Sequence, residues 1–223
     1  MGYRAPVAAG AMVIDSACAV LPHDLLWGMP LSALPDDAPK WAVETVLAGQ
    51  PVVVRRQAMP AGQVAVGLRG YGREQRYAAS MLLDDVYRRV TPEQLVLCPV
   101  ENIQDWPALR ALRQVRPVMD ALELVWGVGG SAGFELASGI AALNQDSDLD
   151  LILRTSEPLS RSCAAELVEA LETSVCLVDV QLQLDHGAVA LREWARPAGR
   201  VLLKTAAGAR LVADPWHLIG ACA

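Results

Sequence analysis

Several features that would mark a membrane protein or a thiolate or imidazole metal site are missing from this sequence. No apolar run reaches the roughly 18 residues that a membrane-spanning helix needs, and no basic stretch followed by an apolar one opens the chain. The three histidines are scattered, and the five cysteines are odd in number and lack a Cys-x-x-Cys pair. These absences argue against a membrane protein, a disulfide framework and a zinc site. We therefore expect a cytoplasmic protein with reduced cysteines.

The chain also lacks an overall basic character, and its charge is unevenly placed. The net charge is −6. Up to Val118 there are 12 Lys plus Arg and 11 Asp plus Glu, a balance of +1, whereas from Met119 onward there are 7 and 14, a balance of −7. Nucleic-acid-binding proteins usually present a basic face, so the sequence indicates no nucleic-acid partner. An acidic second half instead suits a site that binds a metal cation before it accepts a phosphate.

Composition and prolines predict the division into domains. Hydrophobic residues make up 53% of the 223 residues, which is ample for a buried core. Pro117 follows Arg116 at a point where a predicted helix ends, and we place a domain boundary there. We expect an α+β protein with a poorly ordered extension at 1–20, an N-terminal α+β domain at 21–118 and a second domain at 119–223.

Local patterns predict a series of short elements. In the first domain they are a helix at 40–47, strands at 51–55 and 63–68, and helices at about 73–90 and 106–115. In the second domain they are strands at 122–128, 148–153, 175–184, 189–194, 200–204 and 210–212, with helices at 134–138 and about 155–173.

The most informative stretch, Gly129 to Leu153, joins a small-residue turn to a pair of aspartates. Gly130 and Ser131 form a turn that can approach a phosphate closely. Asp148 and Asp150 enter an apolar run that predicts a strand, in which residues two apart share a face. Neighbouring carboxylates repel each other unless a cation lies between them, and carboxylates with substrate phosphates are usual ligands of Mg²⁺. The stretch therefore predicts nucleotidyl or phosphoryl transfer.

A third carboxylate is expected on a later strand. Residues 175–184 alternate between apolar and polar side chains, and Asp179 lies early on the polar side. If this strand lies beside the one that carries Asp148 and Asp150, Asp179 completes a site for one or two Mg²⁺ ions, or for Mn²⁺ in their place. The alternative is an ordinary solvent-facing aspartate.

An arginine-bearing loop is the second candidate phosphate site. It runs Arg69-Gly70-Tyr71-Gly72-Arg73-Glu74-Gln75-Arg76, at the start of a predicted helix. Backbone N–H groups at a helix start and planar guanidinium groups both bind phosphate oxygens, which favours Arg69, Arg73 and Arg76 as phosphate ligands. The alternative is that these arginines are solvated surface charges.

Four other polar residues each allow two interpretations. Asp24 is either the N-cap of the apolar turn that follows it or, with His23, part of a polar pair in a site. Arg154 and Lys204 can contact phosphates or can be surface charges. Both interpretations stay open for each residue at this stage.

The motifs resemble a known family. Gly130-Ser131, Asp148-Leu149-Asp150 and a later strand aspartate are similar to the nucleotidyltransferase superfamily related to DNA polymerase beta. Sixteen residues separate Ser131 from Asp148, a long spacer. With His23-Asp24-Leu25-Leu26-Trp27 and Gly67-Leu68-Arg69-Gly70 ahead of it, this spacer resembles the phosphoribosyl-dephospho-CoA transferase of malonate decarboxylase, or malonate decarboxylase holo-acyl-carrier-protein synthase. The resemblance covers about residues 22 to 220.

The resemblance implies a fold and a reaction. The second domain would have a DNA polymerase beta-like nucleotidyltransferase fold, a mixed sheet flanked by helices. The enzyme would transfer 2′-(5″-triphosphoribosyl)-3′-dephospho-CoA to a serine of the apo acyl-carrier subunit of malonate decarboxylase and release pyrophosphate. Asp148 and Asp150 would hold Mg²⁺, and Asp179 would complete the ligands and draw the serine proton. Gly130 and Ser131 would fix the leaving pyrophosphate.

Two rival functions share parts of this pattern. A nucleotidyltransferase that modifies a small molecule or a protein with an ordinary nucleotide would use the same metal site. A non-catalytic binding module on the same fold would not bring Asp148, Asp150 and Asp179 together. For the carrier subunit, which is expected to be acidic around its serine, we expect docking on the arginine-bearing N-terminal domain.

Overall fold

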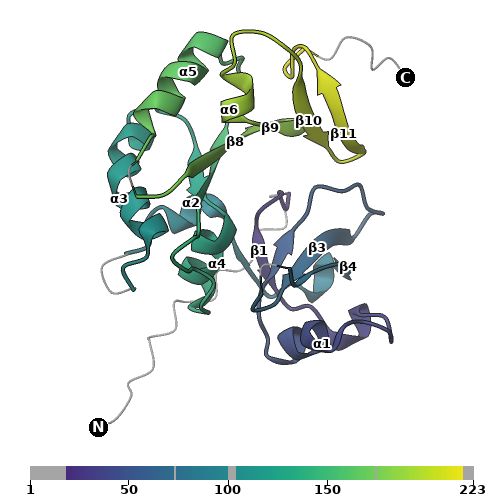
Figure 1. Cartoon of the computed structure of the whole chain (residues 1–223). Coiled ribbons are helices and arrows are strands. Elements are labelled where there is room, and N and C mark those ends of the chain that lie inside the picture. Colours follow the sequence, from purple (N-terminus) through teal and green to yellow (C-terminus); the bar gives the residue numbers. More distant parts are fainter. Residues whose placement is uncertain (1–18, 73, 100–103, 174, 218–223) are drawn as a thin grey trace.

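The structure is a computed structural model that describes residues 19–72, 74–99, 104–173 and 175–217. The extension expected at 1–20 lies outside this part of the chain, except for its last two residues. The described residues form two β-sheets that lie on opposite sides of a cleft, with most of the helices packed against the second sheet (Figure 1).

The first sheet is antiparallel throughout, with strand order β4-β3-β2-β1-β5. Its strands are rich in valine and leucine, which suit a pleated and half-buried surface. Its own core lies between this sheet and helix α1. The elements are β1 (Leu25–Trp27), a 3-10 helix (Leu31–Ala33), α1 (Lys40–Leu47), β2 (Val52–Val54), β3 (Gln63–Arg69), β4 (Arg76–Leu82), a 3-10 helix (Leu83–Asp85) and β5 (Arg88–Val90).

The second sheet has the order β11-β10-β9-β8-β7-β6 and is mixed, since β7 and β8 pair in parallel and the other neighbours are antiparallel. Parallel neighbours need a crossover connection, which α5 supplies here. The elements are α2 (Pro92–Leu95), α3 (Pro107–Asp120), β6 (Trp126–Val128), α4 (Gly130–Ser138), β7 (Leu149–Arg154), α5 (Arg161–Ala170), β8 (Val178–Leu184), β9 (Gly187–Ala190), α6 (Leu191–Trp194), β10 (Val201–Thr205) and β11 (Gly208–Val212).

The two faces of the second sheet differ because alternate residues of a strand point to opposite faces. The apolar set of β7 and β8 belongs to the main core, which is covered by α3, α5 and α6 on the side away from the first sheet (Figure 1). The polar set faces the first sheet and contacts it. The apolar set is Leu149, Leu151, Leu153, Val178, Val180 and Leu182, and the polar set is Asp150, Arg154, Asp179, Gln181 and Gln183.

The α+β class and the mixed sheet flanked by helices are confirmed. The helix at 40–47 and the strands at 63–68 and 175–184 are also confirmed, with ends shifted by up to three residues. The alternation of apolar residues located the strands, and Gly49 marked the end of the helix.

The helix predicted at about 73–90 is wrong. This segment contains β4, a 3-10 turn and β5, and β4 pairs with β3 in full register from Gln63↔Leu82 to Arg69↔Arg76. Tyr77, Ala79 and Met81 point inward at strand spacing. The Gly-rich loop is therefore a hairpin turn, and Arg76 begins a strand instead of following a helix start.

Three smaller expectations also fail. The helix that we ended before Pro117 continues through this proline to Asp120. Residues 191–194 form the short helix α6 instead of continuing a strand. Asp24 is not an N-cap, because the apolar residues after it form β1. In each case tertiary packing overrode the local signal.

No helix in the described ranges combines the length and the apolar character that a bilayer crossing requires.

Helix α2 follows the first sheet directly and packs on β6 at Gly127. A Cβ added to Gly127 would lie 2.4 Å from the Pro92 carbonyl carbon and 2.6 Å from the Glu93 nitrogen, so it would clash with backbone. We predict that Gly127→Ala lowers the free energy of unfolding by about 1–3 kcal/mol, as overpacking does. Chemical denaturation measures this change.

The matched control is Gly67→Ala in β3. The nearest atom to its added Cβ is the flexible Arg55 Cδ at 3.4 Å. Equal stability of the two variants would show that the contact between α2 and β6 is not as tight as the structure has it.

Candidate functional site

A cavity of about 650 Å³ lies between the two sheets and brings together most of the predicted site residues. The second sheet contributes its phosphate-turn and aspartate residues, and the first sheet contributes arginines from β3 and β4. The predicted residues that line the cavity are Gly130, Ser131, Asp148, Asp150, Arg69 and Arg76.

The Gly130 turn packs directly on Asp150. Gly130 has a φ of +56°, a left-handed conformation that favours glycine. A Cβ at this position would lie 1.8 Å from the Asp150 Oδ2, so only a residue without a side chain leaves room for this carboxylate. The Gly129 N–H also donates to the Asp150 carbonyl oxygen at 2.9 Å. Helix α4 begins at Gly130, and its N-terminal N–H groups and dipole favour an anion at this end of the cavity.

The long spacer between Ser131 and Asp148 is held by α4. The Glu135 Oε2 accepts from the N–H groups of Ala142 and Leu143 at 2.7 and 2.8 Å. Further on, the buried Ser147 hydroxyl accepts from the Asn144 N–H at 3.0 Å. These bonds replace regular secondary structure and fix the approach to Asp148.

Arg69 links the first sheet to the phosphate turn of the second. Its Nη2 donates to the Ser131 Oγ at 2.8 Å and to the Ala142 carbonyl oxygen at 2.9 Å, and its guanidinium lies 5.5 Å from the centroid of the Phe134 ring. The sequence selected Arg69 and Ser131 for separate reasons. The structure places both at one point of the cavity wall.

Of the other two loop arginines, Arg76 lines the cavity and Arg73 lies outside the described residues. The Arg76 Nη1 donates to the carbonyl oxygens of Gly72 and Gln75 at 3.1 and 2.9 Å. These bonds tie the guanidinium to the hairpin turn.

Asp179 lies beside Asp150 in the sheet but is not among the residues that line the cavity. The two aspartates are register partners on the parallel strands β7 and β8, so they share the polar face, and Asp179 is exposed. Within the described ranges, no three or more His, Cys, Asp and Glu side chains are grouped as metal ligands. The shared face therefore agrees with the expectation, while the role of Asp179 as a third ligand stays a prediction.

The donor atoms at the cavity suit a hard divalent cation. Asp148 immediately precedes β7 and Asp150 is its second residue, and both line the cavity. Carboxylate oxygens beside an anion-binding turn are the ligand set of Mg²⁺ or Mn²⁺ in phosphate sites. Asp148 and Asp150 thus fit such an ion, with the remaining positions open to substrate oxygens or water.

His23 is the principal wall residue whose place the sequence left open. It has a φ of 78°, and it lines the same cavity as Asp148 and Asp150. Its Nε2 lies 2.7 Å from the Nε2 of Gln181, and because an amide nitrogen donates, the imidazole nitrogen accepts. Burial, helped by the charges of Arg56, Arg154 and Lys204, lowers the pKa of His23 to about 4.

Asp24, next to His23, has a structural role. Its carboxylate is fully buried and lies 2.7 Å from the Arg89 Nη2, and it accepts from the Leu21 N–H at 2.9 Å. Burial raises the pKa of Asp24, although both partners oppose this shift. The pair fixes β1 against β5 behind the cavity.

The sequence analysis did not select Arg55, Tyr77 and Phe134, which also line the cavity. Arg55 follows the valine run of β2, and Tyr77 belongs to the segment mistaken for a helix. Correct strand pairing would have identified both, since β2 and β4 flank β3, the strand that carries Arg69.

The cleft thus has the features of a site for a phosphorylated ligand: a glycine turn at a helix start, two carboxylates and arginines from a facing sheet. A family model described as the phosphoribosyl-dephospho-CoA transferase MdcG N-terminal domain matches residues 21–92, and one for the MdcG C-terminal domain matches residues 95–215. The chain belongs to the MdcG family of phosphoribosyl-dephospho-CoA transferases, which confirms the resemblance seen in its motifs.

Curated relatives named phosphoribosyl-dephospho-CoA transferase agree with this placement. One from Pseudomonas syringae pv. tomato is 87% identical over 211 residues, which are 95% of this chain and 100% of the relative. One from Pseudomonas fluorescens is 62% identical, covering 88% of this chain and 94% of the relative. One from Azotobacter vinelandii is 52% identical, covering 90% and 96%. No solved structure matches the chain.

The low pKa of His23 predicts an acid-sensitive stability. In the unfolded chain a histidine takes up its proton near pH 6.5, whereas folded His23 does so only near pH 4. Between pH 6.5 and pH 4 the unfolded state therefore binds more protons than the folded state. The contribution of neutral His23 to the free energy of unfolding is fully present above about pH 6.5 and is lost as the pH falls towards 4. His23→Asn, which tolerates a left-handed φ, should reduce the loss of unfolding free energy between pH 7.5 and 5 by about 1–2 kcal/mol.

Urea denaturation at the two pH values measures this difference. His217→Asn, at an exposed histidine, is the matched control. The burial of His23 would be refuted by a pH dependence that is the same in His23→Asn and in the unsubstituted protein.

Proposed function

We propose that this protein transfers the 2′-(5″-triphosphoribosyl)-3′-dephospho-CoA group to a serine of the apo acyl-carrier subunit of malonate decarboxylase, with release of pyrophosphate. The observation that carries the proposal is the meeting of Ser131, Arg69 and the Asp148–Asp150 pair at one cavity. The family and the names of the relatives support the donor.

The cavity suits the triphosphate end of the donor. The start of α4 offers N–H groups, and the Ser131 hydroxyl lies beside them. Arg69 and Arg76 add guanidinium groups from the first sheet, and Arg69 lies within hydrogen-bonding distance of Ser131, so both can neutralise phosphate oxygens at this end. We assign the two phosphates of the leaving pyrophosphate to this end.

The metal-binding residues of the proposed mechanism are Asp148 and Asp150, with Asp179 on the neighbouring strand as the third. A bound Mg²⁺ or Mn²⁺ ion would neutralise charge on the triphosphate. Gly130 positions Asp150 because its missing side chain admits the carboxylate. Asp148 and Asp150 act on the reacting phosphate, and the turn holds the departing ones.

The transfer makes one bond and breaks one. The serine Oγ of the carrier forms a bond to the α-phosphorus, while the bond from this phosphorus to the bridging oxygen of the pyrophosphate breaks. The serine proton passes to a carboxylate oxygen of Asp179 and then to solvent. Asp179 suits this task because it is exposed and is the register partner of Asp150 on the neighbouring strand. Positioning and charge neutralisation supply most of the catalysis in such transfers.

Removal of either metal-binding carboxylate should be severe. We predict that Asp148→Asn and Asp150→Asn each reduce the transfer rate by about 10²-fold or more, as loss of an electrostatic stabiliser does. The measurement is a time course of intact-protein mass spectra of the apo carrier subunit with the donor and Mg²⁺, in which a modified carrier gains the mass of the donor less pyrophosphate. Omission of the divalent ion should give a similar loss.

Asp146→Asn is the matched control, because Asp146 is an exposed aspartate in the same loop and outside the cavity lining. A folded Asp150→Asn protein with near-normal transfer would refute the mechanism. A second reaction with ATP in place of the donor separates the proposal from a general nucleotidyltransferase, since adenylylation of the carrier would contradict the donor assignment.

The packing of Gly130 on Asp150 predicts that a side chain at position 130, but not one at position 139, reduces transfer. Gly130→Ala and Gly139→Ala both place a side chain at positive φ, at opposite ends of α4, but a Cβ at Gly139 meets no atom within 4 Å. Gly139→Ala should lose about 1 kcal/mol of stability from the positive φ alone, and Gly130→Ala should lose more because its Cβ also clashes with Asp150. Only Gly130→Ala should also lose transfer, by about tenfold or more, because it displaces a carboxylate. Equal rates in the two folded variants would contradict the role of this contact.

A further inference from the structure

A second depression adjoins the cavity and carries positive charge. It has a volume of about 410 Å³ and shares His23, Val53 and Arg55 with the cavity wall. Its charged lining residues are Arg55, Arg56 and Lys204, and no aspartate or glutamate is among the described residues that line it. We call this surface the cationic groove. It runs between the end of β2 and the β10–β11 hairpin.

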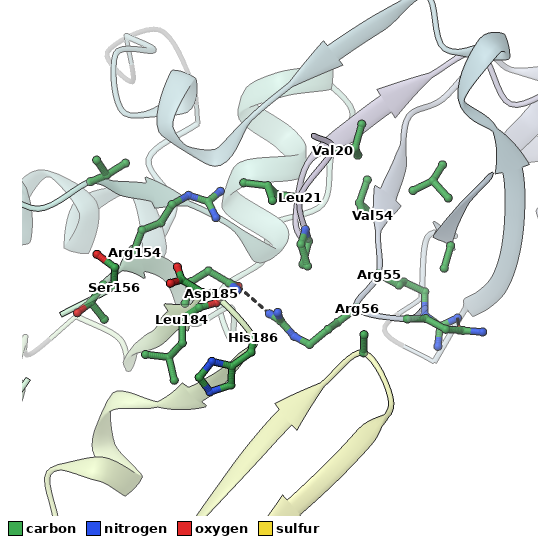
Figure 2. Close-up of a pocket in the computed structure, with 18 of the residues that line it drawn as sticks. Val20, Leu21, Val54, Arg55, Arg56, Arg154, Ser156, Leu184, Asp185 and His186 are labelled. Carbon is green, nitrogen blue, oxygen red and sulfur yellow. Dashed lines mark hydrogen bonds between the residues drawn. The ribbon is translucent and has the colours of Figure 1, made fainter. Parts of the chain in front are cut away.

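Arg56 is held in place by a neutral partner. Its Nη2 donates to the Gln183 Oε1 at 2.7 Å, the bond drawn as a dashed line in Figure 2. The Gln183 amide is itself fixed, because its Nε2 donates to the carbonyl oxygens of Leu184 and Gly187 at 3.0 and 3.1 Å. In the described part of the chain Arg56 has no carboxylate partner, so its charge and its other N–H donors are open to a ligand.

The neighbouring groups confirm that the region is positively charged. Arg56, Arg154 and Lys204 all act to lower the pKa of His23, and only Glu93 opposes them. Glu93 is already paired with the Arg154 Nε at 2.6 Å. Burial and the charge of Arg154 also lower the pKa of Arg56. Arg154 is thus compensated by Glu93, whereas Arg55, Arg56 and Lys204 line the groove without a carboxylate among the described lining residues, an arrangement that favours a bound anion.

A third cavity, of about 840 Å³, continues from the groove and differs from it in charge. Arg55 and Arg56 belong to both walls. Arg154 approaches from the opposite side in Figure 2. Three carboxylates also line this cavity, and much of its wall is apolar. The carboxylates are Glu123, Glu157 and Asp185, and the apolar wall includes Leu21, Val54 and Leu184.

The cationic groove and the partly apolar cavity that continues from it match the chemistry of a dephospho-CoA group. Such a group has an adenosine, a diphosphate and then a long uncharged pantetheine arm with amides and a short apolar end. We propose that the cationic groove binds the diphosphate of dephospho-CoA and that the 840 Å³ cavity takes the pantetheine arm. The inference rests on the proposed function for the orientation of the donor, whose triphosphate lies at Asp148 and Asp150.

Direct binding of dephospho-CoA tests the groove without any transfer. Isothermal titration of the full chain with dephospho-CoA, in the absence of carrier and divalent ion, should give a Kd that rises about tenfold in Arg56→Gln and in Lys204→Gln, because each removes a charged phosphate contact. Lys204 is exposed on β10, so its variant keeps the test valid if Arg56→Gln does not fold. Titration with adenosine, which has no diphosphate, should not distinguish these proteins.

Arg210→Gln, at an exposed arginine of β11 outside the three cavities, is the control and should bind dephospho-CoA normally. Absence of binding, or equal Kd values in all variants, would overturn the inference. The inference would also be overturned if Arg56→Gln and Lys204→Gln bound the carrier more weakly but bound dephospho-CoA with unchanged affinity.

The two proposals fail in different ways. If the protein modifies the carrier but the groove variants keep the KM for the donor, the groove assignment is wrong and the function stands. If dephospho-CoA binds through Arg56 and Lys204 but no carrier is modified, the function is wrong and the groove stands.

Discussion

The polar face of the second sheet is the constraint on which the rest of the structure depends. Helices α3, α5 and α6 cover the opposite face, so Gln181 and Gln183 would otherwise lie open beside an apolar core. The first sheet supplies their partners, His23 for Gln181 and Arg56 for Gln183. Buried polar groups need such partners. Because the polar side chains of the two sheets do not fill the space between them, cavities remain there. The interface between the two sheets is therefore polar, charged and partly hollow, and it contains the candidate site.

Much of the second half of the chain could be predicted from the sequence. The turn at Gly130 and the aspartates that begin β7 are local signals, since their chemistry depends on neighbours in the chain. The placement of Asp179 beside Asp150 required one further assumption, that the two strands are neighbours, and the register bears it out. Whether Asp179 joins the other two carboxylates depends on side-chain positions that a pattern does not encode.

The first half was harder to predict because its elements are short and its contacts are distant in sequence. The hairpin of β3 and β4 was mistaken for a strand and a helix, since Tyr77 and Met81 are four residues apart and fit both periods. His23 contacts a residue of β8 that is 158 positions away in the sequence, and Arg56 contacts another that is 127 positions away. Pro117 shows the opposite case, in which a strong local signal yields to packing inside α3. No spacing rule within one element reveals such contacts.

The contact of Arg69 with the other half of the chain limits which halves can be combined. Its Nη2 donates to the hydroxyl of Ser131 and to the carbonyl oxygen of Ala142, both in the other half of the molecule. The two family models meet between residues 92 and 95, yet this boundary divides the chain and leaves the site undivided. A recombination event there would combine an arginine from one parent with a glycine–serine turn and a spacer from another. The two halves therefore constrain each other at the site, because Arg69 in one half depends on Ser131 and Ala142 in the other.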